Sequence, residues 1–341
     1  MDFLKIDGEF GEGGGQIIRT AITLSCITKQ PIIIENIRKN RKIPGLKAQH
    51  LTAIKILQKI CNAYVEGVKI GSTSLQFIPG DVKSCDLIED VGTAGSISLI
   101  LQVLIPVVAI CKEKLNLTIK GGTDALWSPT IDYTQYVLRE AYSRMGINFS
   151  IKLIKRGYYP KGGGQVNLNV EPSNVKAISL IQRKTKNVNL VCSFSNLPDE
   201  IIKKNIENIE KELTKRKFIV QSQINEENTI DSGASLLIFS IDKESIIGVD
   251  AIFDKKTERF SLDLESFMEN NLGVDERLAD MLVLPASLTN QITIFRVGKI
   301  SKHLETNLFV TSKITGCKYG VGKLSDGFEI RIEGVLNTSI K

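Results

Sequence analysis

The chain has 341 residues, of which 42% are hydrophobic and 24% charged, so it can bury a large core and form two or more domains. Its net charge of +6 is compatible with a polyanionic ligand but far from a histone-like tail. The N-terminus lacks a basic and apolar leader, and the most apolar window, 97–111, is shorter than the roughly 20 residues of a membrane helix. We therefore expect a soluble, cytoplasmic protein that does not enter a membrane.

The cysteines do not form a metal or redox motif. None belongs to a Cys-x-x-Cys pair and none lies near a histidine, which argues against zinc and against a catalytic dithiol. Most lie in apolar surroundings, which is typical of buried free thiols. The pattern leaves one long-range disulfide open. The six residues are Cys26, Cys61, Cys85, Cys111, Cys192 and Cys317.

A glycine-rich loop at 8–16 separates a short strand at 3–6 from a helix expected near 16–28. Glycine lets main-chain N–H groups approach a ligand, and a helix N-terminus attracts negative charge, so the loop is compatible with a phosphate cradle. An ordinary tight turn would have a similar composition. Glu12 is unusual in an anion cradle and is a candidate Mg²⁺ ligand, or else an acid in the first turn of the helix.

Basic residues follow the next strand, at 32–34, and we expect a helix to start at Pro44. Because the basic cluster lies close to the glycine loop in sequence, it indicates a polyanion site, although a charge run is more often a solvated face. The cluster consists of Arg19, Arg38, Arg41, Lys42 and Lys47. Gln49 and His50 lie on the helix that follows, where a polar histidine is more often structural.

The glycine-loop design then recurs. Residues 91–96 open the apolar helix that ends at Cys111, in which Gln102 is a buried amide that needs a partner. Pro129 starts another helix, and the run Gly-Gly-Gly-Gln occurs at both 13–16 and 162–165. These features suggest an internal repeat of helices on small mixed sheets, so the predicted fold class is α+β.

Two later stretches differ from the rest. Glycine becomes rare between about 183 and 271, where strands and one amphipathic helix indicate a compact inserted unit. A helix at 275–285 is expected to point Leu278, Met281 and Leu282 inward and Asp280 outward. His303, one of only two histidines in the chain, follows at a strand-to-helix junction, where it is a candidate nucleophile or a local hydrogen-bonding residue.

Several of these stretches, taken in order, resemble the RNA 3′-terminal phosphate cyclase family over nearly the whole chain. The matching motifs are Gly11 to Gln16 with Arg19, Arg38 to Arg41, Pro44 to His50, Gly92 to Ser96, Gly121 to Asp124, Asp275 to Asp280 and His303 to Asn307. Several independent matches in the right order are far more specific than one glycine loop.

The resemblance implies a fold and a domain organisation. The expected large domain consists of three repeated units, each of two helices and four strands, and is related to the enolpyruvyl-transferase barrels. It would span 1–183 and 274–341, with a small α/β domain inserted at 184–273.

The resemblance also implies an ATP-dependent reaction in three nucleotidyl transfers. A histidine attacks the α-phosphate of ATP, AMP passes to an RNA 3′-terminal phosphate, and the adjacent 2′-hydroxyl closes a 2′,3′-cyclic phosphate. The adenylated histidine corresponds to His303, and the ligand of Mg²⁺ (or Mn²⁺) corresponds to Glu12. The expected ATP contacts are Gln102, Pro129, Arg277, Leu278, Ala279, Asp280 and Met281, and the expected phosphate contacts are Arg19, Arg38, Arg41, Gln49 and His50.

The chain departs from the family pattern at two positions. Many members carry an aromatic residue or histidine at the position of Arg277 and glutamine at that of Met281, although a guanidinium plane can still stack on adenine. One alternative reading is a non-catalytic relative that acts in ribosomal RNA processing, but His303 argues against it. Another is an enolpyruvyl transferase, whose lysine and arginine set is not seen. A homodimer is compatible with the sequence.

Overall fold

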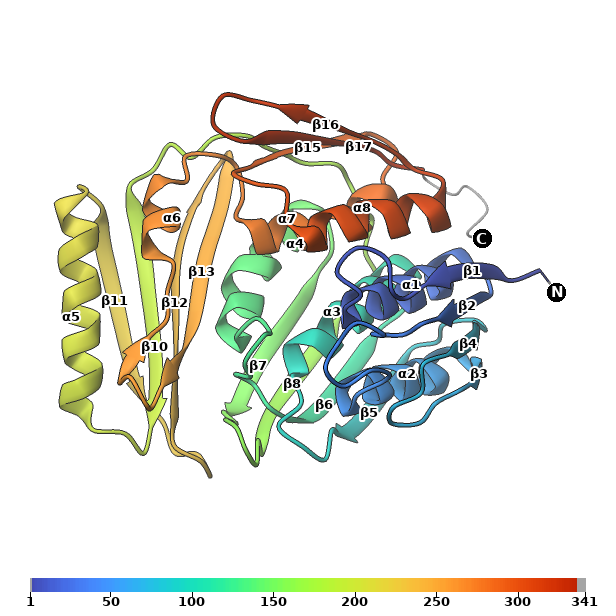
Figure 1. Cartoon of the computed structure of the whole chain (residues 1–341), viewed down its shortest axis with the longest axis horizontal. Helices are drawn as coiled ribbons and strands as arrows, with labels where there is room; N and C mark the ends of the chain where they lie inside the picture. The colour runs from blue at the N-terminus through green and yellow to red at the C-terminus, as the bar shows by residue number, and fades with distance from the viewer. Residues whose placement is uncertain (1, 336–341) are drawn as a thin grey trace.

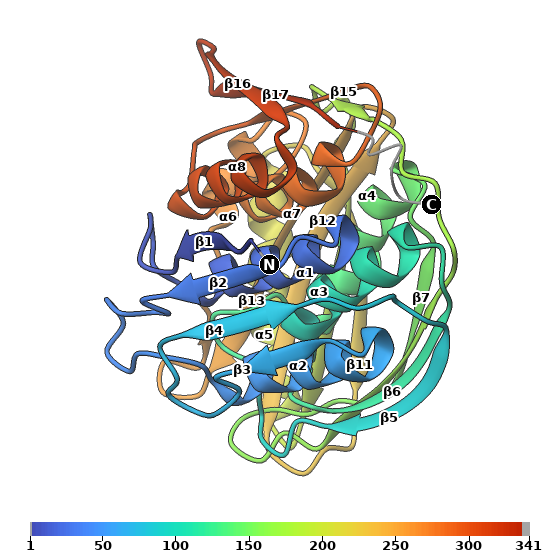
Figure 2. The same ribbon diagram turned by 90° about the vertical axis from the view of Figure 1, so that its right-hand side faces the viewer.

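The computed structural model describes residues 2–335 and combines helices with several mixed sheets, as the α+β expectation required. Three four-stranded sheets and six of the helices form one body, and a five-stranded sheet with two more helices stands beside it (Figures 1 and 2). No helix within residues 2–335 has the length and apolar character needed to cross a bilayer.

The first sheet carries the glycine loop. Its elements are β1 (Leu4–Asp7), α1 (Gly15–Thr28), β2 (Ile32–Glu35), α2 (Ala48–Cys61), β3 (Tyr64–Glu66) and β4 (Leu75–Ile78). The strand order is β1-β2-β4-β3, with β1 parallel to β2 and the other two pairs antiparallel. The glycine loop therefore joins a sheet edge to the N-terminus of α1.

The second sheet has the same pairing. It is built from β5 (Cys85–Asp90), α3 (Ile97–Ile110), β6 (Leu115–Gly121), the π-helical segment η1 (Tyr133–Leu138) that continues into α4 (Arg139–Arg144), β7 (Phe149–Lys155) and β8 (Gly164–Val170). The order is β5-β6-β8-β7, and only the β5–β6 pair is parallel.

The third sheet repeats this order with segments that are far apart in the sequence. It consists of β9 (Ser179–Leu180), α7 (Glu276–Ser287), β15 (Ile292–Val297), α8 (Lys302–Thr315), β16 (Lys318–Lys323) and β17 (Phe328–Glu333). Strand β9 runs parallel to β15, whereas β15–β17 and β17–β16 are antiparallel.

The five-stranded sheet lies between β9 and α7 in the chain. Its members are β10 (Asn187–Ser195), α5 (Asp199–Lys215), β11 (Ile219–Glu226), β12 (Gly233–Asp242), β13 (Ser245–Asp254), β14 (Arg259–Phe260) and α6 (Leu264–Glu269). Apolar residues between 188 and 268 form a separate hydrophobic core. The sheet also contacts the main body, because Tyr136 of η1 stacks on Phe239 of β12 with ring centroids 5.3 Å apart.

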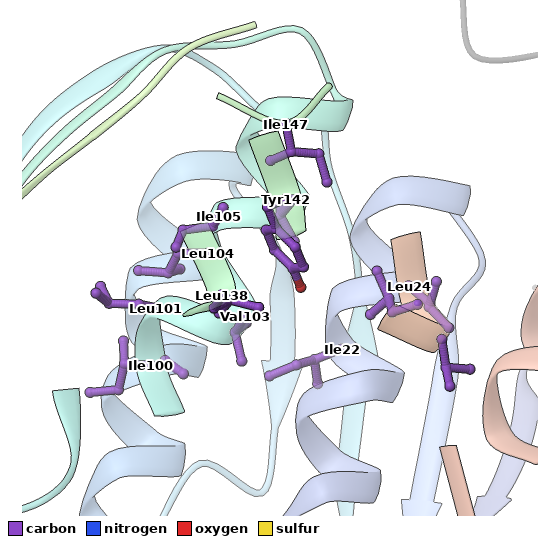
Figure 3. Close-up of a cluster of buried hydrophobic side chains, with 14 of the residues drawn as sticks. Ile22, Leu24, Ile100, Leu101, Val103, Leu104, Ile105, Leu138, Tyr142 and Ile147 are labelled. Carbon is purple, nitrogen blue, oxygen red and sulfur yellow. The ribbon is translucent and has the colours of Figure 1, made fainter. Parts of the chain in front are cut away.

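The main core lies where helices α1, α2, α3, α7 and α8 pack against one another between the sheets. Helix α3 is buried over almost its whole length, which explains its apolar sequence. Figure 3 shows side chains of α3 such as Leu104 gathered with Ile22 of α1 and Tyr142 of α4. This packing holds the N-termini of α1 and α8 in fixed positions.

Two local expectations need correction, and the expectation of free thiols is confirmed. Helix α2 begins at Ala48 rather than Pro44, because residues 38–47 form a loop in which Arg38 has φ +53°. Asp280 does not face outward, since its carboxylate accepts hydrogen bonds from α1 and α8. All six cysteines are free, although the Sγ atoms of Cys26 and Cys61 lie 3.9 Å apart.

Candidate active site

His303 lies in the first turn of α8, which confirms the expected strand-to-helix junction after β15. Ser301 caps this helix by accepting a hydrogen bond from the main-chain N–H of Leu304 at 3.1 Å. The His303 side chain is 47% exposed. It is therefore held at the positive end of a helix while almost half of the side-chain surface stays accessible.

Gln16, in the first turn of α1, determines which ring nitrogen of His303 carries the proton. Its Nε2 donates to the main-chain oxygen of His303 at 2.8 Å and to Oδ1 of Asp280. Only its Oε1 is left to contact Nδ1 of His303, and an amide oxygen can only accept. Nδ1 is therefore the protonated nitrogen, and Nε2 keeps the lone pair.

Asp280 of α7 anchors this arrangement. Asn307, one turn after His303, donates to Oδ1 of Asp280 and to its main-chain oxygen at 3.1 Å. Thr20 of α1 donates in turn to Oδ1 of Asn307 at 2.5 Å. Burial raises the pKa of Asp280 to about 7, although nearby Arg19 and the two amides act in the opposite direction. Three helices are thus joined by one buried polar network.

The glycine loop brings Glu12 to the other edge of the imidazole. Gly11 has φ +60°, and a Cβ there would lie 2.2 Å from Oγ1 of Thr306, so only glycine lets the loop pack on α8. Oε1 of Glu12 pairs with Arg41, and Oε2 lies against Nε2 of His303. That second contact lacks hydrogen-bond alignment, so Oε2 is buried without a hydrogen-bond partner within residues 2–335.

Burial and surrounding cations keep His303 neutral near pH 7. Burial is the main cause that lowers its pKa to about 4, followed by the charges of Arg19, Arg41 and Arg277. Although the contact with Glu12 joins an acid to a histidine, the low pKa means that it is not an ion pair at neutral pH. The ring is thus available as an uncharged nitrogen nucleophile.

The other basic residues gather around the start of α1. Burial lowers the pKa of Arg19 to about 10, which still leaves it charged at neutral pH. Arg38 donates a hydrogen bond from Nη1 to the main-chain oxygen of Gly45 at 3.0 Å, so part of its guanidinium binds the loop to which it belongs. Gln49 accepts from the main-chain N–H of Ser96 at 3.3 Å, which links this region to the second glycine loop.

His50 has a structural contact on both sides of its ring. Its Nδ1 accepts from the main-chain N–H of Lys47 at 3.1 Å, and a Cβ on Gly15 would lie 2.3 Å from its Nε2. Burial and the charges of Arg19, Arg38 and Lys47 lower its pKa to about 3. His50 is therefore a neutral residue packed beneath the first turn of α1.

Of the expected nucleotide contacts, Arg277 and Met281 lie one turn apart on α7. Arg277 sits in the first turn of that helix, with its guanidinium carbon 5.3 Å from the ring centroid of Tyr133. Nη1 of Arg277 lies 2.7 Å from Oδ1 of Asp250. Nε2 of Gln102 approaches Sδ of Met281 at 3.8 Å, whereas Pro129 is buried and directly precedes Thr130.

Two expected contacts point elsewhere. Leu278 and Ala279 are fully buried in the main core, so neither side chain is available to a ligand. A helix turns by about 100° per residue, so consecutive residues cannot all face one site, and these two side chains turn into the core.

Four residues that shape the site were not predicted as site residues, and only two of them could have been found from the sequence. Gln16 and Asn307 belong to recognisable motifs, and the spacing of Asn307 from His303 places both on one helix face. Asp250 and Tyr133 come from segments without such a motif, and only the fold brings them to Arg277.

In sequence the chain is similar to proteins of one family. The model of the family described as RNA 3′-terminal phosphate cyclase matches residues 10–321. An RNA 3′-terminal phosphate cyclase from Methanosarcina barkeri is 38% identical over 96% of this chain and 99% of its own length. One from Sulfolobus acidocaldarius is 38% identical over 97% and 100%, respectively, and one from Pyrococcus furiosus is 36% identical over 96% and 98%.

A solved EPSP synthase from Acinetobacter baumannii covers 97% of this chain and 64% of its own length, at 12% identity and a TM-score of 0.28, a likeness too low to carry an argument. The family model and the relatives instead extend over nearly the whole chain, and the range matched by the family model includes the positions of Glu12, Asp280 and His303. The chain therefore belongs to the RNA 3′-terminal phosphate cyclase family.

Proposed function

We propose that this protein converts an RNA 3′-terminal phosphate into a 2′,3′-cyclic phosphodiester at the expense of ATP. The relatives are named RNA 3′-terminal phosphate cyclases, which supports the cyclisation of an RNA end. The observation that best supports it here is His303, neutral at pH 7 and held by Gln16 so that Nε2 bears the lone pair. A neutral imidazole nitrogen among arginines is suited to attack a phosphorus atom.

In the proposed first step, Nε2 of His303 forms a bond to the α-phosphorus of ATP, and the bond to the pyrophosphate oxygen breaks. The ring then carries positive charge, which the hydrogen bond from Nδ1 to Gln16 spreads toward Asp280. The RNA 3′-phosphate next displaces the imidazole and takes AMP. Finally, the neighbouring 2′-hydroxyl attacks the activated phosphate and releases AMP.

The basic residues supply the charge that these steps require. After burial, the charges of Arg19 and Arg41 contribute to the lowered pKa of His303, so both guanidinium groups act near the proposed nucleophile. A triphosphate and an RNA phosphate meeting at one site repel each other unless cations lie between them. We assign this role to Arg19, Arg38 and Arg41, with Gln49 as a neutral donor and His50 as support.

Glu12 fits the metal that the family pattern implies. Its Oε2 is buried and has no hydrogen-bond partner in the described part of the chain, as expected of a carboxylate oxygen that binds a cation. Residues 2–335 contain no group of three acidic, histidine or cysteine ligands, so Mg²⁺ or Mn²⁺ would depend mainly on phosphate and water oxygens. When bound, the ion would offset negative charge on the phosphates.

The adenine site is proposed between Arg277 and Pro129, with Gln102 and Met281 nearby. The guanidinium of Arg277 already lies over the ring of Tyr133, which shows that it can stack on a flat surface. Asp280 is assigned to holding the histidine rather than to contacting the base, because its carboxylate is occupied by Gln16 and Asn307.

The fold supports a finer description of the chain. We propose three repeated units, since each four-stranded sheet has one parallel and two antiparallel pairs in the same order. The proposed catalytic domain spans 1–183 and 274–341, and the inserted domain spans 184–273, which contains the second hydrophobic core. A cytoplasmic location is proposed because free cysteines are typical of reducing compartments.

The test is covalent labelling with ATP radioactive at the α-phosphate, in the presence of Mg²⁺. The wild-type protein should acquire acid-labile, alkali-stable label, and His303→Ala should acquire none. His50→Asn serves as a control because it removes the only other histidine. An unlabelled wild-type protein would favour the alternative of a non-catalytic relative in ribosomal RNA processing. A second assay with 3′-phosphorylated RNA should show conversion to a phosphatase-resistant end.

A further inference from the structure

Asp250 connects the inserted five-stranded sheet to the proposed adenine site. It lies on β13, and its side chain is only 3% exposed. Oδ2 accepts a hydrogen bond from the main-chain N–H of Thr130 at 2.7 Å, and Oδ1 lies 2.7 Å from Nη1 of Arg277. One buried carboxylate thus touches two segments that are far apart in the sequence.

These two segments form the walls of the proposed adenine site. Thr130 directly follows Pro129, and Arg277 is the flat cation that would face the base. A second contact ties β13 to the same place, because Asp275 accepts from the main-chain N–H of Gly248 and from the hydroxyl of Tyr133, each at 2.8 Å. The inserted sheet is therefore part of the frame around this site.

The contact between Asp250 and Arg277 leaves the arginine able to bind a ligand. The two groups are close enough for an ion pair, but Nη1 lacks hydrogen-bond alignment and is buried without such a partner within residues 2–335. The arginine side chain remains 39% exposed. Asp250 therefore restrains a long, flexible side chain without covering it.

We propose that Asp250 is a positioning residue for ATP, through which the inserted domain sets the spacing between Arg277 and Pro129. This inference rests on the proposed function. A carboxylate suits the task because its two oxygens can hold a main-chain N–H and a guanidinium at once. Restraining both walls before the nucleotide arrives lowers the ordering cost of binding.

The experiment measures adenylation of His303 as a function of ATP concentration in wild type and Asp250→Asn. Asparagine keeps the size of the side chain and an acceptor for Thr130 but removes the charge that holds Arg277. The ATP concentration for half-maximal labelling should rise on the order of tenfold, as expected for a lost charge-assisted contact. The rate at saturating ATP should stay close to that of wild type. Transfer of AMP from labelled enzyme to RNA should also be unchanged.

Asp254→Asn is the matched control, since Asp254 lies on the same strand and its side chain accepts hydrogen bonds from Lys256 and Thr257, two residues of the exposed turn that follows. Arg277→Gln provides the decisive comparison: if Asp250 acts through Arg277, adding Asp250→Asn to it should cause little further loss. If Asp250→Asn does not fold, Asp250→Glu, which moves the carboxylate by one methylene, is measured in the same way.

Two results would overturn the inference. One is the same ATP dependence of labelling in wild type and Asp250→Asn. The other is a double variant in which the ATP concentration for half-maximal labelling rises by the product of the two single-variant factors. Failure of the proposed function is a different result, because the wild-type protein would then not be labelled at any ATP concentration.

Discussion

The two histidines are expected to hold their protons on opposite ring nitrogens. In His303, Nδ1 is protonated because it faces the amide oxygen of Gln16. In His50, Nδ1 accepts from the main-chain N–H of Lys47, so the proton must lie on Nε2. Both pKa values are lowered, to about 4 for His303 and about 3 for His50. A titration from pH 8 toward pH 4 tests both the proton positions and the pKa values.

At pH 5 the lowered pKa greatly reduces the protonated fraction of His303. With a pKa of about 4, His303 would be only about 9% protonated, whereas a histidine at its ordinary pKa of 6.5 would be about 97% protonated. The imidazole therefore stays a nucleophile over the whole physiological range. Removing a nearby positive charge, as in Arg41→Gln, should raise the pKa of His303 because Arg41 is one cause of its depression.

The assay is nitrogen NMR of protein isotopically labelled only in histidine. The chain has just two histidines to assign. Ring-nitrogen shifts distinguish the two neutral forms, and His50→Asn assigns the signals. We expect one Nδ1–H and one Nε2–H ring, neither titrating above pH 5. If His303 titrates near pH 6.5, burial and the nearby arginines do not keep it neutral. If its Nδ1 is unprotonated, the account of Gln16 as the group that orients the nucleophile is wrong.

Three further predictions concern Glu12, Asn307 and His50. Glu12→Gln should raise the Mg²⁺ concentration needed for half-maximal adenylation, and an unchanged Mg²⁺ titration would leave Glu12 only its pairing with Arg41. Asn307→Leu removes a hydrogen-bond donor to buried Asp280, so it should lower the free energy of unfolding, measured in urea, by about 1–3 kcal/mol. The control is Thr311→Val, which removes a buried hydroxyl that has no hydrogen-bond partner within residues 2–335 and should therefore not lower this free energy. Because folding lowers the pKa of His50, its contribution to stability is present above pH 6.5 and is lost as the pH falls toward 3. Between pH 8 and pH 5 the wild type should therefore lose about 2 kcal/mol more stability than His50→Gln, and equal losses in the two proteins would contradict the low pKa.

Residues that act within one local segment were predictable from the sequence. The glycine loop before α1, the apolar helix α3 and the strand-to-helix position of His303 all follow from patterns of a few neighbouring residues. The segment of different composition near 183–271 coincides with the separate hydrophobic core, because a unit that buries its own apolar residues carries its own pattern.

Contacts between distant segments were not predictable in the same way. Asp280 was expected to face outward from an amphipathic pattern, but the polar groups of Gln16 and Asn307 make an inward carboxylate favourable. Leu278 and Ala279 shared a motif with Arg277, yet the turn of α7 sends them into the core. The loop at 38–47 replaced an expected helix start, since Pro44 lies four residues before α2.

By itself, the sequence determined the family resemblance, the α+β class and the candidate nucleophile, because these depend on residue types at short spacings. Only the tertiary structure decided which nitrogen of His303 is free, which way Asp280 points and that Asp250 reaches Arg277. The physical reason is that a proton position or an ion pair depends on partners across the fold. Gln16 and His303, for example, are 287 residues apart in the chain but meet where α1 and α8 pack.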